Sequence, residues 1–265
     1  MPKNKQVFKK MGIVVGGVLL IIVIGTILFV NLSPEFGGSA TEEQRKQYAK
    51  SNNYKSGVFI NVDDVKMELG FSKFFKSLVG YLKSQPNTTP KNNIKTQKID
   101  SVDIVGYKGP TRLIWFGHSA FLLQMEGQNI LIDPMFGEVP APSSLLGGKR
   151  FSKNLPIEIE ELPKIDAVIF SHDHYDHLDY GSIQLLKDKV EKFYTPLGLG
   201  VHLTKWGVER GRILELDWWE ETDFKNIKLI CTPAQHFSGR GLTDRSKTLW
   251  SSWIIQTDTE NIFFS

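Results

Sequence analysis

The sequence predicts a layered α/β domain that is preceded by one membrane-spanning helix. From Pro110 onward, short apolar runs bounded by turn residues are typical of β-strands, and helical stretches occur among them. Before them, residues 11–30 form an uncharged apolar stretch with the length of one transmembrane helix. We expect three parts in the chain: residues 1–32 are a basic start and anchor, residues 33–109 are an N-terminal arm, and residues 110–265 are the domain.

The flanks of the apolar stretch predict its orientation. Four lysines precede it, at Lys3, Lys5, Lys9 and Lys10, whereas residues 31–44 contain no Lys or Arg. Positive charge stays on the cytoplasmic side of a membrane helix, so we expect a cytoplasmic N-terminus and a domain on the opposite side. A cleaved signal peptide is the alternative, but its apolar core is usually shorter, and no clear cleavage site follows here. We favour an uncleaved single-pass anchor.

The arm contains two further helical patterns. Residues 39–57 are polar and basic, and predict a helix or extended segment lying against the domain. Residues 71–84 place five apolar side chains on one helical face: Phe71, Phe74, Phe75, Leu78 and Leu82. Such a helix either lies on the lipid surface or packs on its own domain. Residues 84–93 have no apolar period and predict a linker.

Within the domain the pattern predicts an ordered series of strands. They are expected at residues 112–117, 120–125, 128–134, 166–171, 192–196, 212–219, 226–233 and 252–258. The turn "EGQN" joins the second and third strands as a hairpin. Helices are expected within residues 180–190 and 198–207, and His202 of the second helix is expected to be solvated. Strands that begin antiparallel and then alternate with helices indicate an α/β layered domain.

Composition excludes several classes of site. The 265 residues have a net charge of +3, and their lysines form no stripe interleaved with aromatic residues. We therefore expect no nucleic-acid partner. The single cysteine, Cys231, excludes an internal disulfide and any zinc site built from several thiolates. Its apolar run "IKLICTP" predicts a small buried side chain.

The stretch "FSHDHYDHLD" carries the chemistry. It holds three of the six histidines of the chain, directly after an apolar strand. In near-extended backbone His172 and His174 face the same side. After the turn, Asp176 and His177 approach from a second direction. Imidazole and carboxylate are ligands of zinc, iron and manganese, so the spacing H-x-H-x-D-H predicts a metal site.

Two residues outside this spacing, His236 and His118, are further candidates for the site, whereas Asp179 has a structural role. His236, in "CTPAQHFSG", ends another apolar strand and is a candidate third imidazole. Three histidines on zinc leave a position for water, whose pKa falls toward about 7. His118, in "FGHSAF", lies at a strand junction, where it either reaches the site or is an ordinary surface or core histidine. Asp179 is the candidate N-cap of the following helix.

These motifs resemble a known superfamily. H-x-H-x-D-H after an apolar strand resembles the signature of the metallo-β-lactamase superfamily. "WFGHSAFLLQMEGQNILIDPMFGEVPAPSSLLGGKRF" and "LPKIDAVIFSHDHYDHLD" resemble its N-acyl-phosphatidylethanolamine-hydrolysing phospholipase D branch, which also contains bacterial metal-dependent hydrolases. "SPEFGG" and "SGVFIN" are similar to the N-terminal arm of the bacterial members. The resemblance covers residues 33–265 and is most specific over residues 113–179.

The resemblance implies a fold and a ligand set. The fold is an αββα sandwich with one or two metals, zinc or else iron or manganese, at the edge between two sheets. By motif position, the metal ligands are His172, His174 and His236 for the first metal, and Asp176 and His177 for the second. Asp176 also orients the hydroxide as the catalytic residue, and Asp133, in "ILIDP", orders a ligand histidine.

One departure from the family pattern limits the second metal. In the family a Gly-Asp-x-Gly-Tyr motif follows a strand such as "NIFFS", and its aspartate bridges the metals before a last histidine. This sequence stops at Ser265, ahead of that motif. We therefore expect a sandwich that is incomplete at its C-terminus, with one metal bound tightly and the second weakly.

Three functions remain open. The leading one is a zinc-dependent hydrolase that uses a metal-bound hydroxide on a phosphodiester, such as an N-acyl phospholipid. The alternatives are a lactone or thioester hydrolase of the same fold and a catalytically inactive, membrane-tethered binding protein. The loop "MFGEVPAPSSLLGGKRF" is the expected pocket wall. Lys149, Arg150 and His118 are candidates for substrate binding, whereas a solvated loop is the alternative for the two cations.

Overall fold

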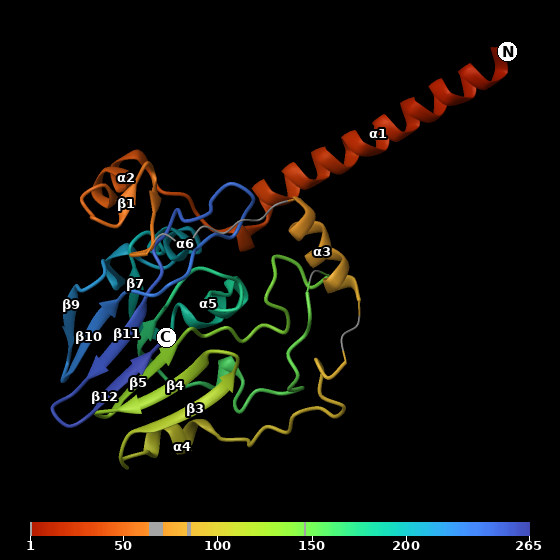
Figure 1. The fold of residues 1–265 in the computed structure, drawn as a ribbon. Coiled ribbons are helices and arrows are strands. Elements are labelled where there is room, and N and C mark those ends of the chain that lie inside the picture. Colours follow the sequence, from red (N-terminus) through yellow and green to blue (C-terminus); the bar gives the residue numbers. More distant parts are fainter. Residues whose placement is uncertain (1, 64–70, 84–85, 146) are drawn as a thin grey trace. The chain divides into compact units, whose positions relative to one another are not determined.

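The computed structural model describes residues 2–63, 71–83, 86–145 and 147–265, and divides the chain into two compact units, Met1–Phe36 and Gly37–Ser265. The first unit is helix α1 (Pro2–Leu32) with a short 3₁₀ helix, η1 (Pro34–Phe36) (Figure 1). Lys10–Leu32, with a mean hydropathy of 3.1, is long and apolar enough to cross a membrane. An N-terminal signal sequence meets the same criterion.

Two sheets form the second unit. The larger has the order β3-β4-β5-β6-β7-β8, with bounds Arg112–Gly117, Ala120–Met125, Gln128–Ile132, Ile165–Ile169, Val190–Pro196 and Ile213–Leu216. The smaller has the order β12-β11-β10-β9, and its strands in chain order from β9 to β12 are Glu221–Phe224, Ile227–Thr232, Ser252–Gln256 and Asn261–Phe264. Every predicted strand is confirmed. Strand β9 was not predicted, because "ETDF" has only one buried residue.

Strand direction changes within the larger sheet. β3, β4 and β5 are antiparallel, whereas β5 to β8 run parallel. The predicted hairpin is confirmed: Met125 pairs with Gln128, and Glu126 and Gly127 both have positive φ, as a two-residue type I′ turn requires. A parallel pair needs a crossover, and helices α5 (Tyr180–Leu186) and α6 (Gly200–Lys205) lie in the connections on either side of β7.

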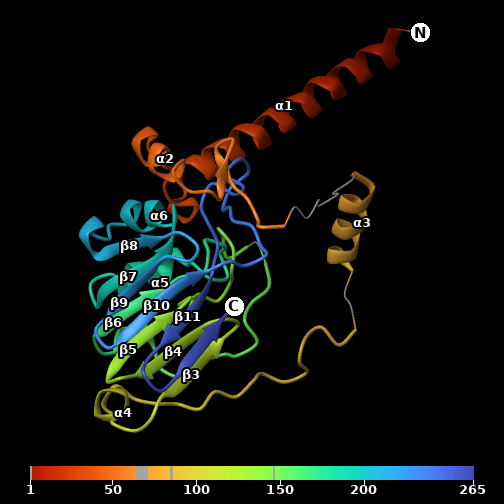
Figure 2. The ribbon, with the colours of Figure 1, turned by 60° about the vertical axis from the view of Figure 1, so that its left-hand side comes forward.

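The central strands of the larger sheet are buried on both faces. In β6, Val168 belongs to a core shared with α5 and α6, whereas Ala167 and Ile169 belong to a second core with Leu229 and Trp253 of the smaller sheet. Helix α4 (Ser101–Gly106) joins the first core. The described residues thus supply a helix layer, a sheet and a second sheet (Figure 2). This is the expected α/β fold.

Two side chains test the predicted burial. Cys231 lies fully buried between the sheets, as predicted, and burial raises the pKa of its thiol. His202 was expected to be solvated, and this prediction is wrong, because only 3% of the residue is exposed. The segment Gly37–Gly38 lies against its ring, and the Gly38 N–H donates to His202 Nδ1 at 3.1 Å.

The arm packs on the domain through a few aromatic side chains. Helix α2 (Glu42–Tyr48) begins with a capping box between Thr41 and Gln44, and confirms the predicted helix. A small hairpin follows, β1 (Tyr54–Lys55) and β2 (Val58–Phe59). Tyr48 and Phe59 are buried in the core between the sheets. The arm is therefore part of the folded unit.

The predicted amphipathic segment forms helix α3 (Phe71–Leu82). Phe75 is exposed. The other four side chains of the predicted apolar face lie outside the described residues: Phe71, Phe74, Leu78 and Leu82. The two interpretations of this helix therefore stay predictions.

Candidate metal centre

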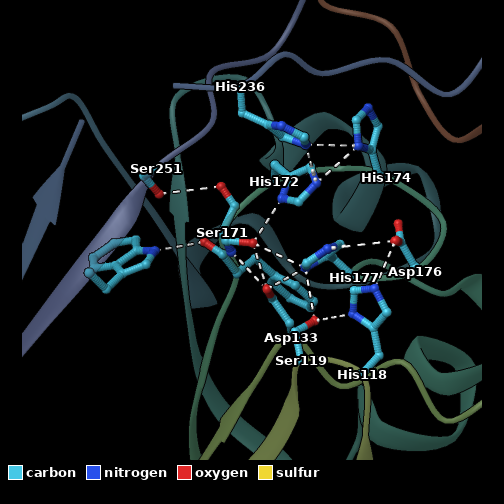
Figure 3. A network of polar contacts seen from close by, with 12 residues as sticks. His118, Ser119, Asp133, Ser171, His172, His174, Asp176, His177, His236 and Ser251 are labelled. Atoms are coloured by element: carbon cyan, nitrogen blue, oxygen red, sulfur yellow. Dashed lines mark hydrogen bonds and ion pairs between the residues drawn. The ribbon is translucent and has the colours of Figure 1, made fainter. Parts of the chain in front are cut away.

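The C-terminal ends of two strands bring the candidate ligands together. β6 ends at Ile169, and the loop after it carries His172 and His174. β10, in the other sheet, ends at Thr232, and His236 follows. The three rings meet at one point from these two loops (Figure 3).

His172, His174 and His236 form what we call the first ligand group. His172 Nε2 lies 3.0 Å from His174 Nδ1, and His236 Nε2 lies 3.1 Å from the former and 3.2 Å from the latter. Nitrogens that bind one tetrahedral zinc at 2.0–2.1 Å are about 3.3 Å apart. The spacing of the three nitrogens therefore fits a single metal ion.

Electrostatics keeps this group in the form that binds metal. Burial and then the neighbouring histidines lower the pKa of His172. Burial also lowers the pKa of His174 and of His236. A histidine must be neutral to offer a lone pair to a metal. The donor set and its charge state therefore both suit a divalent cation.

His118, Asp176 and His177 form a second ligand group beside the first. His118 Nε2 lies 3.2 Å from Asp176 Oδ2, and His177 Nε2 lies 3.8 Å from the same oxygen. One ligand atom from each residue lies within 4.8 Å of the others. The sequence placed Asp176 and His177 together at a second metal, and the structure brings His118 to both of them.

Asp133 orients both groups from behind. Its carboxylate is buried, and Oδ2 lies 2.7 Å from His177 Nδ1. Oδ1 accepts from the Ser171 N–H at 2.7 Å, and the Ser171 hydroxyl donates to Oδ2 while lying 2.9 Å from His172 Nδ1. Burial alone would lower the pKa of His177, but the hydrogen bond and charge of Asp133 raise it overall.

The family is decided by the segment that carries these strands and loops. A family model of the beta-lactamase superfamily domain matches residues 128–265, which include all the ligands named above except His118. This chain belongs to the beta-lactamase superfamily. The match spans more than half of the chain, and it begins at β5.

Relatives of this superfamily member include an uncharacterized protein, a phospholipase D and proteins named as UPF0173 metal-dependent hydrolases. An uncharacterized protein of Mycobacterium tuberculosis is 35% identical over 88% of this chain and 62% of its own length. N-acyl-phosphatidylethanolamine-hydrolyzing phospholipase D 1 of Caenorhabditis elegans is 33% identical over 57% of this chain and 44% of its own. The chain therefore spans less than two thirds of these relatives. The solved isothiocyanate hydrolase from Delia radicum gut bacteria is 26% identical over 55% of this chain and 58% of its own, with a TM-score of 0.43.

The sequence did not reveal the buried residues that support the H-x-H-x-D-H loop. Asp173, between two ligands, is fully buried and accepts from the Gly239 N–H and the Thr248 hydroxyl, both at 2.8 Å. His202 Nε2 lies 3.3 Å from its other side, and Arg240 donates to its backbone carbonyl at 2.5 Å. Burial alone would raise the pKa of Asp173, but these partners hold it below its usual range. Its place at a variable motif position gave no signal.

The second ligand group opens onto a groove of about 860 Å³. Its lining is largely apolar and includes Leu113, Trp115 and Phe151 together with His118 and Asp176. The two candidate substrate cations also line it and already have partners. Lys149 Nζ pairs with Glu138 Oε2 at 2.9 Å, and Arg150 Nη1 donates to the Phe136 carbonyl at 2.8 Å.

Proposed function

We propose that this protein is a metal-dependent hydrolase of phosphodiester bonds that acts on an amphiphilic substrate such as an N-acyl phospholipid. The observation that carries the proposal is the first ligand group, whose three neutral imidazoles converge at 3.0–3.2 Å beside a second group. Relatives named as N-acyl-phosphatidylethanolamine-hydrolyzing phospholipases D support the substrate class. Zinc is the first choice of metal, with iron or manganese suited to the same ligands.

The residues of the site have different roles in the proposed mechanism. A metal held by the first ligand group would supply Lewis acidity and would lower the pKa of a water molecule at neutral pH. The first ligand group holds the metal, and Asp133 holds His172 and His177 in the required orientation through the contacts described above. Asp176 is the general base in this proposal, because its Oδ2 lies 3.2 Å from His118 Nε2 and 3.8 Å from His177 Nε2.

The groove suits the apolar part of the substrate. Leu113 and Trp115 line it with largely exposed side chains, more than half of each residue being accessible. Burying such side chains against an acyl chain is favourable by about 25 cal/mol per Å². Lys149 and Arg150 supply positive charge for the phosphate, with Lys149 exchanging its exposed ion pair with Glu138 for the substrate.

A membrane location of the protein is part of this proposal. We propose that Lys10–Leu32 spans the bilayer, with a cytoplasmic N-terminus and the second unit on the opposite side. A lipid substrate would then be at hand. Cysteine labelling of the intact membrane with an impermeant reagent, on single cysteines placed at Lys3 and Lys228, tests the orientation, and labelling of Lys3→Cys from outside the cell contradicts it.

Hydrolysis by the full chain in detergent tests the proposal. Wild-type protein should release product from N-acyl phosphatidylethanolamine and bis-4-nitrophenyl phosphate, and His174→Ala should reduce kcat/KM by roughly 10³-fold or more, because a metal ligand is lost. Lys46→Ala, an exposed arm residue, is the control. Retained turnover in His174→Ala contradicts the mechanism. Faster hydrolysis of a lactone or thioester contradicts the substrate class, and binding of the lipid without turnover would favour an inactive binding protein.

A further inference from the structure

His118 occupies an unusual backbone position between β3 and β4. The strand register shifts between Trp115 and Gly117, and the next two residues have left-handed backbone, with φ of +119° at Gly117 and +44° at His118. A non-glycine residue in this region is held at a cost of about 1–3 kcal/mol. The bulge turns His118 out of the strand alternation and toward the loop after β6.

The ring of His118 is oriented like that of a metal ligand. Its Nδ1 lies 3.0 Å from Ser119 Oγ, and its Nε2 faces Asp176 Oδ2 at 3.2 Å. His177 has the same arrangement, with Asp133 at Nδ1 and Asp176 near Nε2. Metal-binding histidines almost always engage one ring nitrogen in such a hydrogen bond and offer the other to the metal.

One ligand atom from each of His118, Asp176 and His177 faces a common point. The buried Asp133 accepts from His177 Nδ1–H, so Nε2 of the neutral His177 ring would carry a lone pair. With its proton on Nδ1, His118 would donate to Ser119 Oγ and offer a second lone pair at Nε2, whereas with its proton on Nε2 it would donate to Asp176 Oδ2. One ligand atom of each residue lies within 4.8 Å of the others. A cation bound there would favour the His118 tautomer with its proton on Nδ1.

We propose that His118 is the third protein ligand of a second metal, held together with Asp176 and His177, and that Ser119 is the positioning residue that sets the His118 tautomer. Two nitrogens and one oxygen suit a zinc, manganese or iron ion. The inference rests on the metal binding of the proposed function and not on its substrate. It revises the expectation from the sequence that the second metal has only two ligands in this chain and binds weakly.

Metal titration of the full chain tests the ligand assignment. The protein in detergent is stripped with a chelator and titrated with Zn²⁺, with stoichiometry measured by mass spectrometry and affinity by calorimetry. Wild type should bind two ions. His118→Ala should bind the first ion unchanged and the second more than about 100-fold more weakly, a larger loss than outer-shell substitutions cause. Two ions of unchanged affinity in His118→Ala overturn the proposal.

A second test, based on the appearance of an absorption band, applies even if His118→Ala disturbs the fold. His118→Cys loaded with Co²⁺ should show a thiolate-to-cobalt charge-transfer band in the near ultraviolet. Trp115→Cys, three residues earlier and likewise exposed, is the matched control and should show none. The native Cys231 is buried in both variants. Absence of the band from His118→Cys, or an equal band in Trp115→Cys, contradicts the assignment.

The Ser119→Ala variant distinguishes the positioning role of Ser119 from metal binding by His118. It should weaken the second metal by roughly 10-fold and leave the first unchanged, because Ser119 Oγ contacts Nδ1 of both His118 and His177, and neither ring loses its metal-binding nitrogen in the variant. An unchanged second affinity removes Ser119 from the proposal. All these readouts are taken without substrate, so a failed hydrolysis assay leaves them standing, and their failure leaves the hydrolase proposal to be judged on turnover.

Discussion

The two ligand groups lie side by side, yet they are supported in different ways. The first draws His236 from the smaller sheet and two histidines from the larger one, so it exists only when the two sheets are packed. The second comes entirely from loops of the larger sheet, with His118 after β3 and the other two ligands after β6.

The two ligand groups also differ in how far they are buried. His172 is buried, and the network of Asp173, His202 and Arg240 lies behind it. The His118 side chain is 58% exposed and lines the groove. Burial excludes water and lowers the pKa of the first group, whereas exposure leaves room for a substrate at the second. We infer that the first group anchors a metal and the second meets the substrate.

Breaking the support of the first group should have the largest effect. Asp173→Asn removes the charge that faces the buried Arg240 and His202, and the cost of an uncompensated buried charge is about 3–5 kcal/mol. Urea unfolding measures it. Asp188→Asn, at an exposed position, should change the free energy of unfolding by less than about 0.5 kcal/mol. A loss below about 1 kcal/mol for Asp173→Asn would show that the network is not a support.

The far end of the same network can be tested in the arm. Gly37 has φ of +74°, and a Cβ there would lie 2.1 Å from His202 Nδ1. Gly37→Ala should therefore cost about 2–3 kcal/mol through backbone strain and displacement of His202. Gly106→Ala meets no atom within 4 Å and is the control. If the two variants are equally stable, the arm does not support the network behind the first ligand group.

Asp133→Asn should act most strongly on the second group. The charged partner of His177 Nδ1 is lost, so we expect the second metal to bind 10–100-fold more weakly, or about 1.4–2.7 kcal/mol. The first metal should weaken less, because Asp133 reaches His172 only through Ser171. Two-site zinc titration distinguishes the losses, and a larger loss at the first site would reverse the comparison.

The smallest effect is a difference in protonation within the metal-free chain. Asp133 raises the pKa of His177 above 6.5, whereas burial lowers that of His172 below it. The His177 contribution to stability is thus present below about pH 6.5 and lost as the pH rises through its raised pKa. For His172 the unfolded chain binds more protons below about pH 6.5, so stability falls as the pH falls. NMR titration of the imidazoles, assigned with His177→Gln, should show His177 protonating first.

Local patterns in the chain were enough to predict all the strands except β9, the hairpin, the helix cap and a cluster of four candidate ligands. Strand alternation, the "EGQN" turn and the Asp179 cap, which accepts from the Ser182 N–H at 2.8 Å, act over a few residues. The spacing of the ligands after β6 is equally local. The resemblance added Asp133 and strengthened the candidate His236, which the sequence had marked only by its place after another apolar strand.

Packing between distant segments decided the rest. His202 looks like a surface residue on a short helix, but the arm covers it, and Asp173 was indistinguishable from a loop aspartate until Arg240 and Thr248 were beside it. His118 reaches the second group because a bulge at the end of β3 turns it toward a loop that lies almost sixty residues further along the chain. Such contacts depend on the layering of two sheets, and residue spacing carries no information about it.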